Sequence, residues 1–271
     1  MLSPRLSALC GENSPDVELK LVRGALLNDG LLSIEALSPL AMDTEAEAER
    51  LGLFGSARRA FTGIAAVARA RVEGADEERK SQLFDVLNAE GEIIMAKTRE
   101  DIHRNGFWHR AINVWVLSTS TSRVLLGQRS VGKEENQGRW TCACARLPRG
   151  ELSMSFATQC LFSEFSIGVV PDKQLSLLFS IKCPRPILKG LFVGQHDKAW
   201  IDVYVACLEQ ETPVEKLSLD LREKRAAKYV TLDELQAAFE SNSEDIVVPS
   251  AAEYSAKLLW HLRRLCKGQA P

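Results

Sequence analysis

The sequence lacks a long apolar run, an excess of charge of one sign, and an internal repeat. Without about 18 consecutive apolar residues, no segment is long enough for a transmembrane helix. The formal net charge is −2, from 34 basic and 36 acidic residues, so the clustered basic excess of a nucleic-acid-binding protein is missing. The seven cysteines are an odd number scattered along the chain. They do not fit a disulfide framework and favour a reducing compartment.

The first residues also lack a clear targeting signal. The first ten contain one arginine and two serines, and acidic residues follow at Glu12 and Asp16. The apolar stretch is too short for a secretory signal, and the segment is under-basic for a mitochondrial transit peptide. We therefore expect a cytoplasmic protein, with a mitochondrial location as the alternative.

The composition is that of a folded protein, with 45% hydrophobic and 26% charged residues in a chain of 271. This length accommodates one domain and a sizeable extension. Residues 1–80 contain helical signals, namely a capping box at Thr44 and Glu47 and an apolar helical face over residues 61–72. A charged segment at residues 76–80, a candidate linker, follows. We predict a helical N-terminal extension over residues 1–80.

The residue pattern changes after residue 80, where short apolar runs rich in β-branched and aromatic residues predict strands. These runs are 83–87, 92–96, 111–117, 123–129, 175–181 and 199–208. Predicted helices cover 153–165 and 257–265, and a third begins at the capping box of Thr231 and Glu234. We predict an α/β (α+β) domain over residues 81–240, with a mixed sheet between helical layers, and a C-terminal helix packed on it within residues 241–271.

Several motifs follow one another in a fixed order within this domain. They are TREDIHRNGFWHRA at 98–111, LLGQR at 125–129, QGRW at 137–140 and RGE at 149–151. Their order and spacing resemble the isopentenyl-diphosphate isomerase-like branch of the Nudix hydrolase superfamily. The resemblance implies a Nudix-type α/β/α sandwich with a mixed sheet.

The Nudix box of that family is degenerate in this chain. The box reads Gly, five residues, Glu, seven residues, Arg-Glu, an apolar residue, any residue, Glu-Glu, any residue, Gly and an apolar residue. At the named positions this chain has Ala145, Glu151, Gln159, Cys160, Leu161, Ser163, Glu164, Ser166 and Ile167. Only Glu151 and Glu164 therefore remain among the charged positions.

The resemblance implies a Mg²⁺ (or Mn²⁺) ion held by Glu151 and Glu164, which would bridge diphosphate oxygens and help to generate an attacking hydroxide. The thiol of Cys160 is a soft ligand that does not favour Mg²⁺. Two carboxylates remain enough for one ion, since Mg²⁺ commonly uses one or two protein carboxylates. The loop that bears Glu151 must then fold back onto the helix that bears Glu164.

The isomerase of this branch offers a second comparison. Cys144 stands seven residues before Glu151, as the isomerase's catalytic cysteine does before its glutamate. Asp202 falls where that enzyme has its catalytic glutamate. The resemblance thus implies Cys144 and Asp202 as candidate acid/base residues.

The metal ligands of the isomerase are matched only in part. His103 and His109 fall near its two early metal histidines, although they are six residues apart rather than seven. Arg146 stands in place of another metal histidine, and Trp200 in place of a metal glutamate. A site that lacks two of five ligands is a poor candidate for a tightly bound ion.

Basic side chains near the box are candidates for binding phosphate. Guanidinium groups can hold phosphate oxygens in a bidentate way, which favours Arg146 and Arg149 beside the Gly-Glu loop. Arg129 and His109 complete the predicted substrate-binding set. The alternative is that these are solvated loop charges or, for His109, a packing residue.

Three functional hypotheses remain open. The first is a divergent Nudix hydrolase that cleaves a diphosphate linkage in a nucleotide or related small molecule. The second is a non-catalytic Nudix module that binds a diphosphate ligand, or a protein partner through the N-terminal extension. The third is an isomerase that uses Cys144.

Overall fold

A computed structural model describes residues 80–131, 135–186 and 196–269. Its strands and helices are, in chain order, β1 (Leu83–Leu87), β2 (Ile93–Thr98), α5 (Arg99–Asn105), β3 (Trp108–Ser118), β4 (Arg123–Arg129), β5 (Trp140–Thr141), β6 (Ala143–Arg146), α6 (Ser153–Phe165), β7 (Leu175–Pro186), β8 (His196–Leu208), η2 (Val214–Lys216), β9 (Lys224–Thr231), α7 (Leu232–Glu240) and α8 (Ala252–Cys266). The predicted helical extension over residues 1–80 lies outside the described residues, except for Lys80.

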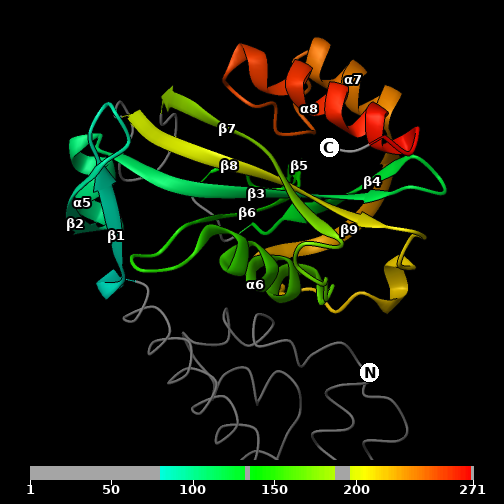
Figure 1. Ribbon diagram of the computed structural model, residues 1–271, viewed down its shortest axis with the longest axis horizontal. Helices are drawn as coiled ribbons and strands as arrows, with labels where there is room; N and C mark the ends of the chain where they lie inside the picture. The colour runs from blue at the N-terminus through cyan, green and yellow to red at the C-terminus, as the bar shows by residue number, and fades with distance from the viewer. Residues whose placement is uncertain (1–79, 132–134, 187–195, 270–271) are drawn as a thin grey trace, which may run out of the picture. The chain divides into compact units, whose positions relative to one another are not determined.

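The described strands form one mixed sheet around β3. β3 pairs antiparallel with β1, β4 and β6, and parallel with β8. Farther out, β2 pairs with β1, β7 with β8, and both β5 and β9 with β4. In Figure 1, α7 and α8 cover one face of the sheet and α6 covers the other. The predicted α/β/α sandwich with a mixed sheet is confirmed.

β3 is continuously apolar from Val114 to Leu117, where both of its faces are buried. Side chains alternate between the faces of a strand. Ile112, Val114 and Val116 pack in the core beneath α6, whereas Trp115 and Leu117 pack in the core beneath α7 and α8. This part of the strand therefore has the continuous apolar character of a central strand rather than a polar–apolar alternation.

The C-terminal helix α8 contributes fully buried side chains to the second of these cores. Tyr254, Leu258 and Leu262 each have 0% of their surface exposed. The Tyr254 hydroxyl accepts hydrogen bonds from Asn113 Nδ2 at 2.7 Å and Trp115 Nε1 at 3.0 Å. The boundaries at residues 80 and 240 stay a prediction.

Two helix ends show how local sequence fixes the elements around the site. At the start of α7, the predicted capping box is present: Glu234 N donates to Thr231 Oγ1 at 3.1 Å, and Thr231 N donates to Glu234 Oε2 at 2.7 Å. At the end of α6, Ser166 adopts a left-handed conformation with φ 54°. The Nudix box has glycine there, because a residue without Cβ adopts this conformation at little cost.

Within the described residues, no helix has both the length and the apolar character that a membrane crossing requires.

Candidate functional site

Glu164 is the only acidic residue of the box that is buried, with 3% of its surface exposed. It lies in the last turn of α6 and faces strand β6. Its Oε1 accepts a hydrogen bond from the backbone N–H of Cys144 at 3.2 Å and one from Cys160 Sγ at 3.4 Å. Burial raises the pKa of the Cys160 thiol well above its usual value, so this sulfur stays a protonated donor. The helix carboxylate is thereby fixed against the strand.

The second oxygen of Glu164 faces a buried lysine. Lys224, the first residue of β9, has 1% of its surface exposed, and its Nζ lies 3.2 Å from Glu164 Oε2. The same ammonium donates a hydrogen bond to the backbone oxygen of Cys142 at 3.0 Å. We call this arrangement the Glu164–Lys224 pair.

The absence of a side chain at Gly127 on β4 leaves space for the aliphatic stem of Lys224. A Cβ added to Gly127 would lie 2.7 Å from Lys224 Cδ and 2.7 Å from Phe165 Cζ. Real Cβ atoms do not tolerate such distances, so the stem and the Phe165 ring fill the volume that a side chain at residue 127 would need. The position of the ammonium is thus set by packing as well as by charge.

The two partners of the pair shift each other's charge state. Burial raises the pKa of Glu164, and the Lys224 ammonium acts against that rise. Burial opposes the charged form of Lys224 as well, yet the Glu164 carboxylate raises the pKa of the lysine above its usual value. Each group therefore favours the charged form of the other, against the burial that opposes both charges.

A second buried group of charges surrounds Asp197 at the start of β8. Asp197 Oδ1 lies 3.6 Å from His103 Nδ1 and 3.4 Å from His109 Nε2. On its other oxygen, Arg185 donates two hydrogen bonds at 3.0 and 2.6 Å, and Arg146 Nη2 lies 3.7 Å away. We call these five residues the Asp197 cluster.

The Asp197 cluster holds an ionised carboxylate beside two neutral imidazoles. Burial, reinforced by the positive charge of Arg146, lowers the pKa of His103 to about 3 and that of His109 to about 4. Although burial opposes ionisation of the carboxyl, Arg146 and Arg185 lower the pKa of Asp197 far below its usual value. The positive charge beside this carboxylate therefore comes from arginine.

With this geometry in place, comparison with known proteins identifies the domain. No protein-family model matches the chain. Over 189 residues, which are 68% of this chain, it is 30% identical to the protein named Nudix hydrolase 3 from Arabidopsis thaliana. The chain carries a Nudix domain.

Other relatives match more distantly. The chain is 29% identical over 105 residues, 37% of its length, to isopentenyl-diphosphate Delta-isomerase 2 from Photorhabdus laumondii. A crystal structure of DR0079 from Deinococcus radiodurans is 15% identical, with a TM-score of 0.47 over 68% of this chain and 100% of that one. The matched regions span 24% of the Arabidopsis protein and 59% of the Photorhabdus protein.

The Nudix box of this chain does not assemble a set of metal ligands. Among the described residues, no group of three or more His, Cys, Asp or Glu side chains is arranged to hold a metal ion. Glu151 is exposed, and its side chain makes no hydrogen bond or ion pair with a described residue. Glu164 already holds an ammonium. A Mg²⁺ or Mn²⁺ ion shared by Glu151 and Glu164 therefore does not fit the donor groups that are present.

The other predicted metal ligands lie in the Asp197 cluster. His103 and His109 are brought together, with ring centroids 5.8 Å apart. Arg146, which stands where the resemblance expects a metal histidine, points its guanidinium at the same carboxylate as these two rings. Here too, a protein cation lies among residues that the family resemblance assigns to metal binding.

The predicted isomerase residues lie on opposite faces of the sheet. Asp202 is paired with Ile112 of β3, and Cys144 is paired with the adjacent Asn113. Successive residues of a strand point to opposite faces. Asp202 also accepts hydrogen bonds from Ser153 Oγ at the start of α6 and from Arg110, at 2.6 and 2.5 Å. The structure does not bring Cys144 and Asp202 together, so it gives no support to an isomerase that uses both.

The predicted phosphate-binding residues are dispersed. Arg129 donates to the backbone oxygen of Glu135 at 3.1 Å and to Cys144 Sγ at 3.7 Å. Arg146 and His109 are engaged in the Asp197 cluster. Arg149 is 60% exposed in its side chain and lies 3.8 Å from Asp85. Arg149 is thus the most accessible of the four side chains.

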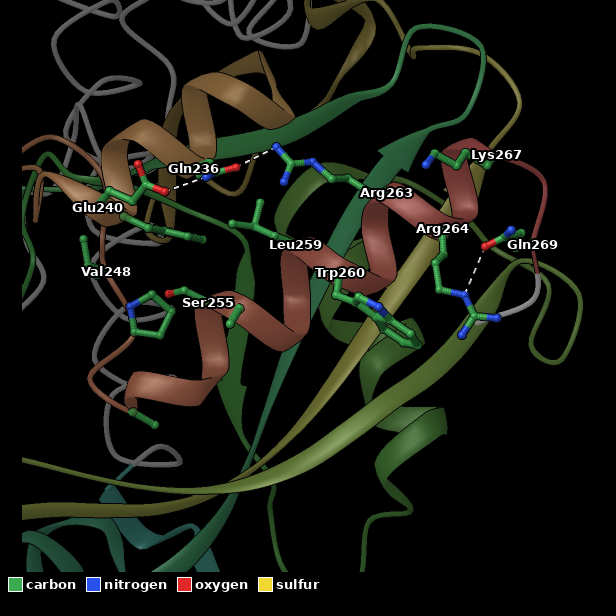
Figure 2. Close-up of a pocket in the computed structure, with 14 residues that line it drawn as sticks. Gln236, Glu240, Val248, Ser255, Leu259, Trp260, Arg263, Arg264, Lys267 and Gln269 are labelled. Carbon is green, nitrogen blue, oxygen red and sulfur yellow. Dashed lines mark hydrogen bonds between the residues drawn. The ribbon is translucent and has the colours of Figure 1, made fainter.

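A separate groove of about 680 Å³ lies between α7 and α8, away from both charge clusters. Figure 2 shows that two of its basic side chains are engaged: Arg263 bonds Gln236, and Arg264 bonds Gln269. The guanidinium of Arg264 also lies 4.5 Å from the centroid of the Trp260 ring. The lining of the groove includes the apolar side chains of Phe239, Val248 and Leu259 and the ring of Trp260.

Sequence reasoning missed Lys224, Asp197 and Arg185. Lys224 lies in a run of charged residues that looks like a solvated turn, and no periodicity marks it as buried. One signal was present for the Asp197 cluster. A basic residue at a position expected to bind a metal ion, as at Arg146, requires a nearby acid if it is buried.

Proposed function

We propose that this domain is a Nudix module that binds a diphosphate-containing small molecule and does not carry out Mg²⁺-dependent hydrolysis. The observation that carries the proposal is the Glu164–Lys224 pair. The buried carboxylate of the box is neutralised by an ammonium 3.2 Å away. Mg²⁺ at this position would need the oxygen that the lysine already occupies.

The other box positions support the same proposal. Metal-assisted hydrolysis needs carboxylates to hold the ion and a base to activate water. Cys160 is a protonated thiol that donates to Glu164, and Ser163 Oγ donates to the backbone oxygen of Cys160 at 3.0 Å. Neither side chain can replace a carboxylate in these roles.

The ligand class follows from the family and from one accessible side chain. One relative's name specifies a diphosphate, isopentenyl diphosphate. In this chain, Arg149 presents an exposed guanidinium beside Gly150, whose left-handed conformation (φ 81°) forms the turn into Glu151. A guanidinium can form two parallel hydrogen bonds to phosphate oxygens.

The test combines binding and turnover. ADP-ribose and isopentenyl diphosphate are titrated by calorimetry in EDTA and in Mg²⁺, and product release is followed in parallel. We expect equal affinity in both buffers, no product, and about tenfold weaker binding for Arg149→Ala, the loss of one charge-assisted contact. Arg104→Ala, on the exposed face of α5, is the control and should bind like the wild type.

A divergent hydrolase is the second candidate, favoured by the identity to a protein named as a hydrolase. Mg²⁺-dependent release of product that disappears in Glu164→Gln would establish this candidate and overturn the first. Failure of both probes to bind in either buffer would also overturn the proposed ligand class.

A further inference from the structure

We infer that Lys224 is a built-in replacement for the metal ion of the Nudix box, and that its removal converts the same oxygen-lined space into a divalent cation site. This inference deepens the proposed function and rests on it for the role of the domain as a whole. Its own basis is the geometry around the ammonium.

The ammonium of Lys224 contacts two oxygen atoms that are also hard metal ligands. Lys224 Nζ lies 3.2 Å from the carboxylate oxygen Glu164 Oε2 and 3.0 Å from the backbone oxygen of Cys142. Carboxylates and backbone carbonyls are also the ligands that Mg²⁺ and Mn²⁺ prefer, with water completing the shell. The lysine therefore uses the donors that a cation at this place would need.

The lysine cannot easily leave to admit an ion. Its side chain is 1% exposed, and the stem and the ring of Phe165 together fill the space beside Gly127. A divalent ion beside the ammonium would be repelled by a like charge in an interior of low dielectric constant. Binding would thus require the ammonium to be displaced from a packed position.

The buried carboxylate explains why a cation stays at this place. Glu164 is fixed by the Cys144 N–H and the Cys160 thiol whatever lies on its other oxygen. Removing one partner of a buried ion pair leaves an uncompensated charge, which is strongly destabilising. In a protein that keeps the glutamate without the metal, another cation can balance the carboxylate, and Lys224 is placed to do so.

The experiment measures Mn²⁺ binding and thermal stability in the full chain without any diphosphate ligand. Electron paramagnetic resonance counts free Mn²⁺, and the unfolding midpoint is recorded against Mn²⁺ concentration. For the wild type we expect no stoichiometric binding and no change in midpoint. For Lys224→Ala we expect a lower midpoint that rises with Mn²⁺, because a ligand that binds the folded state stabilises it.

Matched variants test whether the response to Mn²⁺ depends on the Glu164–Lys224 pair. Lys228→Ala removes a lysine from the same strand that lies over the Trp140 ring, 4.3 Å from its centroid, and should behave like the wild type. Lys224→Ala combined with Glu164→Gln should lose the response to Mn²⁺. Adding Cys160→Glu to Lys224→Ala should tighten Mn²⁺ binding by about tenfold or more, because it restores a second carboxylate.

Two results would overturn the inference. One is stoichiometric Mn²⁺ binding by the wild type that Glu164→Gln abolishes. Both of these proteins keep Lys224, so this measurement does not require the Lys224→Ala variant to fold. The other is a Lys224→Ala response no larger than that of Lys228→Ala. Since no diphosphate is present, neither result bears on ligand binding, whereas metal-dependent turnover at another site would overturn only the proposed function.

Discussion

The Glu164–Lys224 pair and the Asp197 cluster bury a carboxylate in two different ways. The pair balances one carboxylate with one ammonium, which also bonds the backbone oxygen of Cys142. The cluster surrounds one carboxylate with two guanidinium groups and two neutral imidazoles. An ammonium can lose its proton when its partner is removed, but a guanidinium cannot. The two regions should therefore respond differently to the same chemical change.

The two regions also share a relation to the metal ion that the Nudix resemblance implies. Both regions contain residues that the Nudix resemblance assigns to metal binding, and in both an amino-acid cation lies against the carboxylate. This parallel makes a single accidental substitution a weak explanation.

Removing the carboxylates tests the contrast most strongly. We expect Asp197→Asn to lower the free energy of unfolding by about 3–5 kcal/mol, because two half-buried arginines lose a buried counter-charge and cannot become neutral, although Arg185 keeps its ion pair with Glu135. Glu164→Gln should cost less, about 2 kcal/mol, since burial can drive Lys224 to its neutral form. Urea denaturation at pH 7.5 measures both. Equal losses would mean that the ability to release a proton is not what separates the two regions.

The pH dependence of the free energy of unfolding should also distinguish the two regions. The unfolded chain protonates its imidazoles below about pH 6.5, whereas folded His109 does so only near pH 4 and His103 near pH 3. Unfolding between these values takes up protons, so stability is full above pH 6.5 and falls as the pH drops. His109 alone should account for roughly 3 kcal/mol at pH 4. Glu164 acts with the opposite sign, because burial raises its pKa.

The measurement is the free energy of unfolding from pH 7.5 to 4, with His196→Asn as an exposed control. The charged groups that act on these rings are Asp197, Arg146, Arg185 and, for His103, Arg99. His109→Asn should flatten the profile in this range, whereas the control should not alter it. A profile for His109→Asn that matches the wild type would remove the Asp197 cluster as the source of acid sensitivity.

Local pattern was enough to predict most of the fold. The runs 123–129 and 153–165 coincide with β4 and α6, since each is a compact apolar segment with clear boundaries. β6 was missed because four residues carry too little periodicity, and β9 because its first half is basic. Short or charged strands are recognised only from the partner with which they pair.

The candidate site was less predictable because its decisive contacts are long-range. Glu164 was predicted from the box, but Lys224 lies 60 residues farther along the chain. The register of β9 on β4 brings them together, with Arg129 opposite Lys224 after an irregularity in the pairing. No local rule indicates that one lysine in a run of charged residues will turn inward.

Gly127 provides the finest test of the pair, because it probes packing and leaves every charge in place. We expect Gly127→Ala to destabilise the fold by about 1–3 kcal/mol, since the new methyl group would overlap the Lys224 stem and the Phe165 ring. Gly168→Ala is the matched control, because an added Cβ there meets nothing within 4 Å. That change should be neutral or stabilise slightly.

A double-mutant cycle separates the two contacts of the added methyl group. In a Lys224→Ala background the overlap with the lysine stem is gone, so Gly127→Ala should cost less than in the wild type, and the Phe165 ring should account for what remains. Urea denaturation of the four proteins measures this coupling. A coupling near zero would mean that the stem moves aside freely. Packing would then not hold the ammonium, and the Glu164–Lys224 pair would depend on charge alone.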